Sequence, residues 1–374
     1  MNIEINSKAH YDAADCFVFH LKKKGFGLFV LTLFVFAVGM VTAQDSVKTK
    51  NMKILPVPSI GYSPETKTYI GAVTLVTFNH RADTSVRTSN FKVEVNYTWN
   101  KQLILETGWN SFLSNEKWFT KGLLHYSHYP DYYYGVGSAA PKENKTLYNS
   151  NRFVADVYAL KKIAKNMFGG LNLRLGSYKK VEPENNSIAF DELINAEHVG
   201  AGLSFLNDSR NNILTPTRGF FVMTNLSYNF SSLNYTRLTA DARYYKTWKN
   251  NITFSSRFVH VFTFGTPPFY DYAYLGGDQF VRGFYYGRYR DKNLGSLQAE
   301  FRMPVFWRIG AAFFGGGSNL YSHAAALSTA ATKFNYGMGL RFLVDKKDKT
   351  NLRLDYAMGS NGNSGFYIAF GESF

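Results

Sequence analysis

Apolar and polar residues alternate along the chain from Ile54 onward, and this period of two limits the fold more than any other feature of the sequence. Successive side chains of a β-strand lie on opposite faces, so the alternation predicts strands with one apolar and one polar face. Between Phe91 and Trp99, for example, apolar residues alternate with polar ones such as Lys92 and Glu94. The sequence therefore predicts an all-β chain.

The alternating segments are long, and their polar face carries charges. They run to about 9 to 14 residues, whereas strands of soluble proteins usually have about 5 to 6. Arg and Glu in the middle of the polar face suit a watery lumen and would be costly in a dry core. Between Ile54 and Phe374 we count roughly sixteen segments, an even number as in bacterial outer-membrane barrels. These features favour a transmembrane antiparallel β-barrel of about 16 strands over a soluble β-sandwich.

The connections between segments alternate between long and short. The long ones fall at 130–150, 179–196, 265–292 and 318–331. Each joins an odd-numbered segment to an even-numbered one, so all four are expected on the outer side, where barrels have their long loops. The turn near 79–88 is longer than this rule prefers. No shift in composition divides the chain, which predicts a single barrel domain over 54–374.

The N-terminus has the pattern of an export signal. Lysines at 22–24 precede an apolar run at 26–43 that ends in small residues. This pattern predicts a cleaved signal peptide over 1–43, followed by a short periplasmic segment over 44–53. A retained single-span anchor is the alternative. The only cysteine, Cys16, precedes the cleavage point, so we expect no disulfide and no cysteine-based metal site in the mature chain.

The net charge of +15 raises the question of nucleic-acid binding. No run of Lys or Arg exceeds three residues and no basic helical face is present, so a nucleic-acid partner is not expected. Exported basic chains more often line a lumen or contact anionic headgroups. The partners expected from charge are therefore outer-membrane lipids, including lipopolysaccharide.

The sequence offers no enzyme motif and no cofactor site. His125 and His128 lie three residues apart, which on a strand places them on opposite faces, so they are not expected to bind a metal. The glycines at 315–317 lack the spacing and lysine of a phosphate-binding loop, and no Gly-x-Ser-x-Gly elbow occurs. We therefore expect no enzyme, although a lipase built from Ser and His on a barrel wall would escape such a motif search.

The long connection at 265–292 contains Val281-Arg282-Gly283-Phe284, an arginine flanked by apolar residues. Exposed loop tips are normally polar, so this segment is expected to fold inward and dock. Glu300 falls on the polar face of its segment and is expected to point inward, where a confined charge-assisted pair with a folded-in Arg282 would be stronger than an exposed one. Gly283 fits a backbone turn that a side chain would block. A solvent-exposed Arg282 is the alternative.

Two further motifs accompany this segment. Asp208-Ser209-Arg210 is followed by Pro216 and Gly219, and the chain ends in an aromatic-rich segment over 366–374. Together with the loop segment and the strand around Glu300, they occur in a specific order. With these four pieces the chain resembles the BamA/TamA-like superfamily of outer-membrane assembly and translocation barrels, also called the bacterial surface-antigen family.

The resemblance implies a role for each piece. The loop is expected to be the sixth outer loop, between strands eleven and twelve, folded into the barrel with Arg282 facing Glu300. Asp208, Arg210, Pro216 and Gly219 are expected to form a periplasmic turn. The C-terminal signal read by assembly machinery is expected to comprise Phe366, Ile368, Phe370, Gly371 and Phe374.

The chain departs from the family pattern in two ways. Where the next strand of the family has an aspartate that also holds the loop arginine, this sequence has glycine within 315–317. The arginine is then expected to rely on Glu300 alone or to borrow Asp355 from a neighbouring strand. Only about ten residues separate Ala43 from Ile54, too few for the periplasmic docking (POTRA) domains of the family. We therefore expect a bare barrel.

These expectations lead to three hypotheses of function in the Gram-negative outer membrane. The first is an assembly or translocation barrel that works with a separate periplasmic or outer-membrane protein. Its seam would join the two shortest strands, at 54–62 and 366–374, and Pro56 and Pro58 would weaken that seam by removing ladder donors. The second is a channel plugged by the inward loop. The third is a structural or binding subunit of an outer-membrane complex.

Overall fold

The computed structural model describes residues 52–63, 66–78, 87–99, 101–184, 190–213, 215–326, 328, 331–345 and 350–374. The predicted signal peptide over 1–43 lies outside the described residues, as do most of the 44–53 segment and most of the turn at 79–88. The first strand begins at Met52, within the predicted periplasmic segment.

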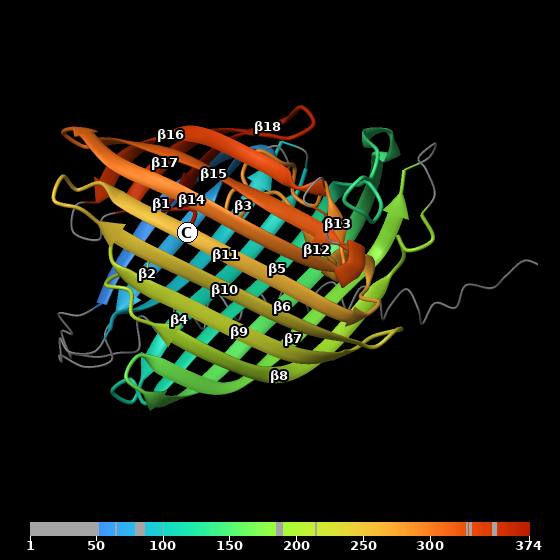
Figure 1. Ribbon diagram of the computed structural model, residues 1–374, viewed down its shortest axis with the longest axis horizontal. Helices are drawn as coiled ribbons and strands as arrows, with labels where there is room; N and C mark the ends of the chain where they lie inside the picture. The colour runs from blue at the N-terminus through green and yellow to red at the C-terminus, as the bar shows by residue number, and fades with distance from the viewer. Residues whose placement is uncertain are drawn as a thin grey trace, which may run out of the picture. The chain divides into compact units, whose positions relative to one another are not determined.

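Sixteen strands form one antiparallel sheet, which confirms the all-β prediction and the strand number. In Figure 1 the yellow and orange strands cross in front of the teal strands of the first half. Each strand pairs with its neighbours in the chain, and β1 also pairs with β18, so the strand order closes on itself as a barrel. The strands of this sheet are β1 (Met52–Ser63), β2 (Lys67–Phe78), β3 (Ser89–Thr98), β4 (Leu103–Leu113), β5 (Trp118–Tyr133), β6 (Thr146–Ala164), β7 (Met167–Pro183), β8 (Ala196–Asp208), β9 (Gly219–Phe230), β10 (Tyr235–Thr247), β11 (Thr253–Gly265), β14 (Asn293–Phe306), β15 (Ile309–Tyr321), β16 (Lys333–Asp345), β17 (Thr350–Gly359) and β18 (Asn363–Phe370).

Few other elements occur in the described residues. The connection between β11 and β14 holds a small two-stranded sheet, β12 (Ala273–Tyr274) with β13 (Arg290–Asp291). Three single-turn 3₁₀ helices are η1 (Lys142–Asn144), η2 (Phe269–Asp271) and η3 (Ala324–Ala326). Among the described residues, no helix is long and apolar enough to cross a membrane.

The strands bury their polar residues and expose their apolar ones. In β8, His198 and Ser204 are buried whereas Val199 and Leu203 are more than half exposed. The same inversion runs along β16, where Leu340 is exposed and Arg341 is buried. An outer apolar face and an inner polar face follow directly from the alternation in the sequence.

The inner face is not uniformly polar, although a watery lumen was expected from the sequence. An apolar cluster covers part of it and draws on six consecutive strands from β4 to β9. Arg87 closes over this cluster, with its guanidinium 4.2 Å from the centre of the Phe112 ring. The buried members are Phe112, Phe119, Leu160, Phe168, Leu206, Phe221 and Met223.

Several predicted boundaries are wrong. The last strand ends at Phe370 rather than at Phe374, and residues 371–374 leave the sheet. Strand β1 has 12 residues and is not among the shortest, whereas β18, with 8, is the shortest of the large sheet. The strands flanking the long connections extend further than expected, since β6 alone has 19 residues. Hydrogen bonding in a two-stranded ladder can continue past the point where the apolar alternation ends.

Candidate functional site

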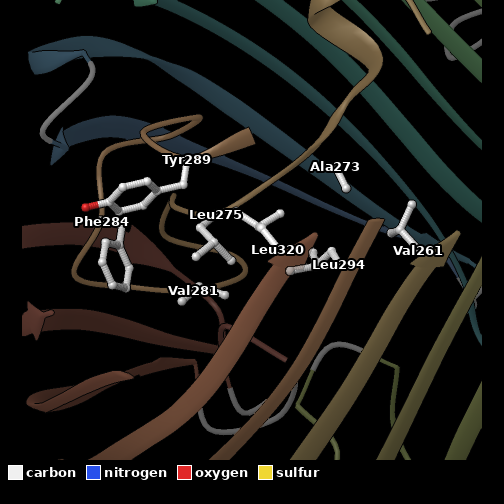
Figure 2. Close-up of a cluster of buried hydrophobic side chains, with 8 residues drawn as sticks. All are labelled: Val261, Ala273, Leu275, Val281, Phe284, Tyr289, Leu294 and Leu320. Atoms are coloured by element: carbon white, nitrogen blue, oxygen red, sulfur yellow. The ribbon is translucent and has the colours of Figure 1, made fainter. Parts of the chain in front are cut away.

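The connection between β11 and β14, residues 266–292, lies against the inner face of the sheet. These strands are the eleventh and twelfth of the large sheet. Side chains of the connection form an apolar cluster with residues of β11, β14 and β15, and Figure 2 shows Leu275 and Val281 beside Leu294 and Leu320. Val281 and Phe284 are fully buried. The apolar residues that flank Arg282 in the sequence therefore bury apolar area here, which stabilises the loop against the wall.

Arg282 lies between two carboxylates. One terminal nitrogen of its guanidinium is 2.6 Å from Glu300 Oε2 on β14, and the other is 2.6 Å from Asp355 Oδ2 on β17. All three side chains are at most 2% exposed. The guanidinium also stacks 3.4 Å from the centre of the Phe314 ring on β15, a cation–π contact. Asp355, the alternative partner that the sequence allowed for Arg282, lies on β17, and β15 and β16 separate this strand from β14.

Arg282 belongs to a larger ionic cluster on the inner face. Arg341 Nη1 lies 2.5 Å from Asp355 Oδ1, and Arg353 Nη1 lies 2.9 Å from Asp355 Oδ2. Arg353 also holds Asp278 of the loop at 2.6 Å. Alternating signs at these distances compensate each buried charge. The sequence analysis did not include Arg341, Arg353 and Asp278 in the site. The two arginines fall on the polar, inward-facing positions of their strands, so the alternation could have indicated them.

Gly283 allows the loop to approach the wall. Its φ is +102°, in the region that favours glycine, and a Cβ there would lie 2.8 Å from the backbone of Met358. The Gly283 N–H donates to the Tyr367 hydroxyl on β18 at 2.9 Å. The tip of the loop is therefore bonded to the last strand as well as to β14 and β17.

The same connection is fastened elsewhere on the inner face. Asp271 accepts hydrogen bonds from Arg174 of β7 at 2.8 Å and from the Tyr235 hydroxyl of β10 at 2.7 Å. Tyr285 donates to Asp131 of β5 at 2.7 Å. Burial alone would raise the pKa of Asp271, but the guanidinium groups of Arg174 and Arg237 outweigh it and hold this pKa well below its usual range.

The predicted turn residues come together between β8 and β9. Arg210 Nη2 donates to Asp208 Oδ2 at 2.8 Å, and its guanidinium lies 4.4 Å from the centre of the Phe221 ring. Gly219 has a φ of +105°, and a Cβ there would lie 2.3 Å from the Ser209 carbonyl oxygen. Pro216 belongs to the same turn, and its carbonyl accepts from Arg302 of β14 at 3.3 Å.

The C-terminal residues divide into two groups. Phe366 is exposed on the outer face of β18, Ile368 lies opposite Leu354 of β17, and Phe370 ends the strand. After Gly371 the tail turns to the inner face, where Glu372 bonds Arg341 at 2.9 Å and Phe374 is buried. Glu372 therefore joins the ionic cluster, and the residues after Phe370 do not extend the strand.

The ladder between β1 and β18 is short. Its described pair is Tyr62 with Ile368, and this antiparallel register places Ile60 opposite Phe370, the last residue of β18. Residues 52–59 therefore extend beyond the end of β18, although they pair with β2 throughout. Pro56 and Pro58, which were predicted to weaken the seam, lie in this overhang and not opposite β18. The overlap of β1 and β18 is short because of the register of the two strands.

The histidine pair has the expected geometry. His125 contacts Glu106 on the inner face, whereas His128 is exposed and bonds Asn151. In the described part of the chain, no group of three or more His, Cys, Asp or Glu residues could hold a metal ion.

The sheet topology defines the chain as a sixteen-stranded antiparallel β-barrel with polar residues inside. The loop between β11 and β14 is attached to the inner face of this barrel. A family model for the Omp85 superfamily domain matches residues 72–374, and the chain belongs to the Omp85 superfamily. This confirms the family suggested by the sequence motifs.

Two solved structures are similar to this chain. One is BamA from Haemophilus ducreyi lacking POTRA domains 1–3, with 12% identity, a TM-score of 0.56, and coverage of 86% of this chain and 70% of that one. The other is CdiB from Acinetobacter baumannii, with 13% identity, a TM-score of 0.54, and coverage of 86% and 60%. At such identities the similarity shows the fold. A search of curated proteins finds no match.

Proposed function

We propose that this protein is an outer-membrane barrel that helps other polypeptides insert into or cross the outer membrane of a Gram-negative cell through the seam between β1 and β18. Superfamily membership supports the class of function. The observation that carries the proposal is the short overlap at the seam, where residues 52–59 extend beyond the end of β18. An edge of this kind can pair with an incoming strand.

The fastened loop gives the seam a control point. The loop tip bonds Tyr367 of β18, and Arg282 ties the same tip to Glu300 and Asp355. On this proposal the loop occupies the barrel lumen and holds β18 in place, so that release of the loop and opening of the seam are coupled. The predicted roles of the 208–219 turn as a periplasmic turn and of the C-terminal residues as an assembly signal are part of the same proposal.

The surroundings follow from this placement. We propose that the exposed apolar residues of the outer face contact membrane lipid, including lipopolysaccharide. Residues 1–43 act as a cleaved signal peptide, and the residues between this peptide and β1, which begins at Met52, start the mature chain on the periplasmic side. A separate periplasmic or outer-membrane protein delivers the client.

A crosslink across the seam tests this function. Tyr62→Cys with Ile368→Cys places two thiols at the described pair, and the matched control Leu354→Cys with Ile368→Cys joins β17 to β18. We expect the oxidised seam pair to stop insertion of a small barrel client into proteoliposomes and reduction to restore it, while the control pair stays active. Full activity of the oxidised seam variant would contradict the proposal.

The loop contacts also favour a second candidate, a plugged channel. Asp271 and Tyr285 fasten the connection to β7, β10 and β5, so the loop reaches several parts of the inner face. A channel predicts steady conductance in planar bilayers that rises when the loop is released. Insertion activity without such conductance would favour the assembly barrel.

A further inference from the structure

A cavity of about 220 Å³ lies where three connections meet the first residues of β16 and β18, at the end of the barrel that the sequence predicts to face outward. Ala139 to Lys142 come from the β5–β6 connection, and Arg288 and Tyr289 come from the β11–β14 loop. Lys333 begins β16, and Asn361 and Asn363 come from the β17–β18 turn and the start of β18. The cavity is thus built from segments that are far apart in the sequence.

The lining carries three cations and no carboxylate. Lys142, Arg288 and Lys333 surround a space of small volume, and no ion pair with a carboxylate is described for any of them. Lys142 is exposed, Lys333 is half-buried and Arg288 is buried, and none of the lining side chains supplies a negative charge that would offset these cations.

Arg288 is the deepest of these cations. It is 6% exposed, and its guanidinium is fixed by the Tyr134 and Tyr289 rings, at 4.4 and 4.3 Å from their centres. Nη2 donates to the Ala140 carbonyl at 2.9 Å, while Nη1 is buried with no hydrogen-bond partner in the described part of the chain. A buried guanidinium nitrogen without an acceptor is costly, so the charge of Arg288, which lines the cavity, is incompletely compensated by its described neighbours.

The other donors complete the site. Lys333 Nζ lies 4.6 Å from the centre of the Tyr289 ring, and the Asn361 amide donates to the Tyr289 hydroxyl at 3.2 Å. Tyr289 is itself buried in the apolar cluster of the loop. The positions of Arg288 and Lys333 are therefore set by the packed loop and not by flexible side chains alone.

We propose that this cavity binds a phosphate group. One guanidinium and two ammonium groups match the near-dianionic charge and the several acceptor oxygens of phosphate better than the single charge of a carboxylate. The group is inorganic phosphate, a soluble phosphate ester, or the phosphate of a lipid headgroup such as that of lipopolysaccharide. Their shared chemistry is the tetrahedral oxyanion.

Calorimetric titration of the folded, full-length protein with inorganic phosphate in chloride buffer tests the site. We expect saturable binding at one site that weakens about tenfold in Lys333→Gln, the loss that corresponds to about 1.4 kcal/mol for one charged contact. Arg288→Gln is expected to abolish it, and Lys333→Gln serves if that variant does not fold. Lys145→Gln, an equal charge change on the same connection outside the cavity, is the matched control and is expected to bind as the wild type.

A second arm identifies the source of the phosphate. Vesicles with lipopolysaccharide are compared with vesicles whose lipopolysaccharide has lost its phosphates. Binding of inorganic phosphate with no preference between the vesicles supports a soluble ligand. A preference for the phosphorylated vesicles that is lost in Lys333→Gln supports a lipid headgroup. No saturable binding in either arm, or equal weakening by Lys145→Gln, would overturn the proposal.

Discussion

Asp355 is the carboxylate on which the inner ionic cluster converges. Arg282, Arg341 and Arg353 all lie within 2.9 Å of it. Glu300 has fewer close partners, since only Arg282 approaches it within 3 Å and Arg341 and Arg302 lie 3.5 Å away. Among the described residues of the cluster, Arg282 is the one cation that comes from the β11–β14 loop. Its charge therefore attaches this loop to the strands of the barrel wall.

Arg282→Ala is expected to release the loop and to lower the free energy of unfolding by about 3 kcal/mol, because both carboxylates stay buried with one counter-charge fewer. The measurement is urea unfolding in detergent, together with maleimide labelling of a Val281→Cys reporter, which is fully buried while the loop is docked. Lys92→Ala is the control, since this inner-face lysine pairs with Glu94 and Glu106 and none of its described contacts is with the loop. It should lower stability without exposing the reporter. An unlabelled reporter in Arg282→Ala would show that the pair does not hold the loop.

Asp271 gives a prediction for pH. Its folded pKa lies below the unfolded value, so its contribution to stability is complete above about pH 4, the ordinary range of Asp, and is lost as the pH falls through the folded pKa. We expect Asp271→Asn to unfold at a lower temperature than the wild type at pH 7. The difference should narrow on acidification below pH 4. Thermal unfolding of both proteins between pH 7 and pH 2.5 measures it, and a constant difference would contradict the assigned ion pair with Arg174.

At the level of elements, the turn between β8 and β9 depends on one backbone position. Gly219 has both a positive φ and a close neighbour, whereas Gly362, in the β17–β18 turn, has a φ of +70° and no atom within 4 Å of a built Cβ. A comparison of substitutions at the two glycines therefore distinguishes the cost of a steric clash from the cost of backbone strain.

Gly219→Ala is therefore expected to cost more than Gly362→Ala. The control carries only the strain of a left-handed residue, about 1 to 2 kcal/mol, while Gly219→Ala adds a clash with the Ser209 carbonyl. Folding yield and urea unfolding of both variants test this. Equal losses in the two variants would mean that the turn relaxes around the added methyl group.

The sequence predicted the strands of this protein more completely than it predicted the contacts of the site. Alternation determines which residues face inward, so the inward position of Glu300 and the number of strands could be predicted. It does not determine the height of a residue along the barrel, which depends on ladder register. Asp355 could therefore be named only as an alternative partner of Arg282, and its simultaneous contact with Arg282 beside Glu300 could not be predicted. The inward turn of the tail that brings Glu372 to Arg341 could not be predicted either.

At the level of the whole molecule, the exposed apolar residues form the outer surface of the barrel. On β16, Leu340 lies near the middle of the strand and Phe334 near its outer end, and both are more than half exposed. If this surface faces lipid, the cost of a charge depends on depth in the bilayer.

Leu340→Arg is expected to lower the unfolding free energy in lipid vesicles by about 2 to 4 kcal/mol, and Phe334→Arg by about 1 kcal/mol or less, because a charge costs most at the bilayer midplane. Urea unfolding of vesicle-embedded protein measures both. Similar costs at the two positions would place this face of β16 away from the membrane.

The attachment of the loop to the inner face has a mechanical consequence for the barrel wall. Its contacts brace β5, β7, β10, β14, β17 and β18 from within, and β1 to β4 carry none of these contacts. A closed sheet that is braced along most of its circumference deforms mainly in the strands that are not braced. Because the apolar cluster also packs β4 against β5 to β9, any change in the circumference of this barrel is concentrated in β1 to β3, beside the seam.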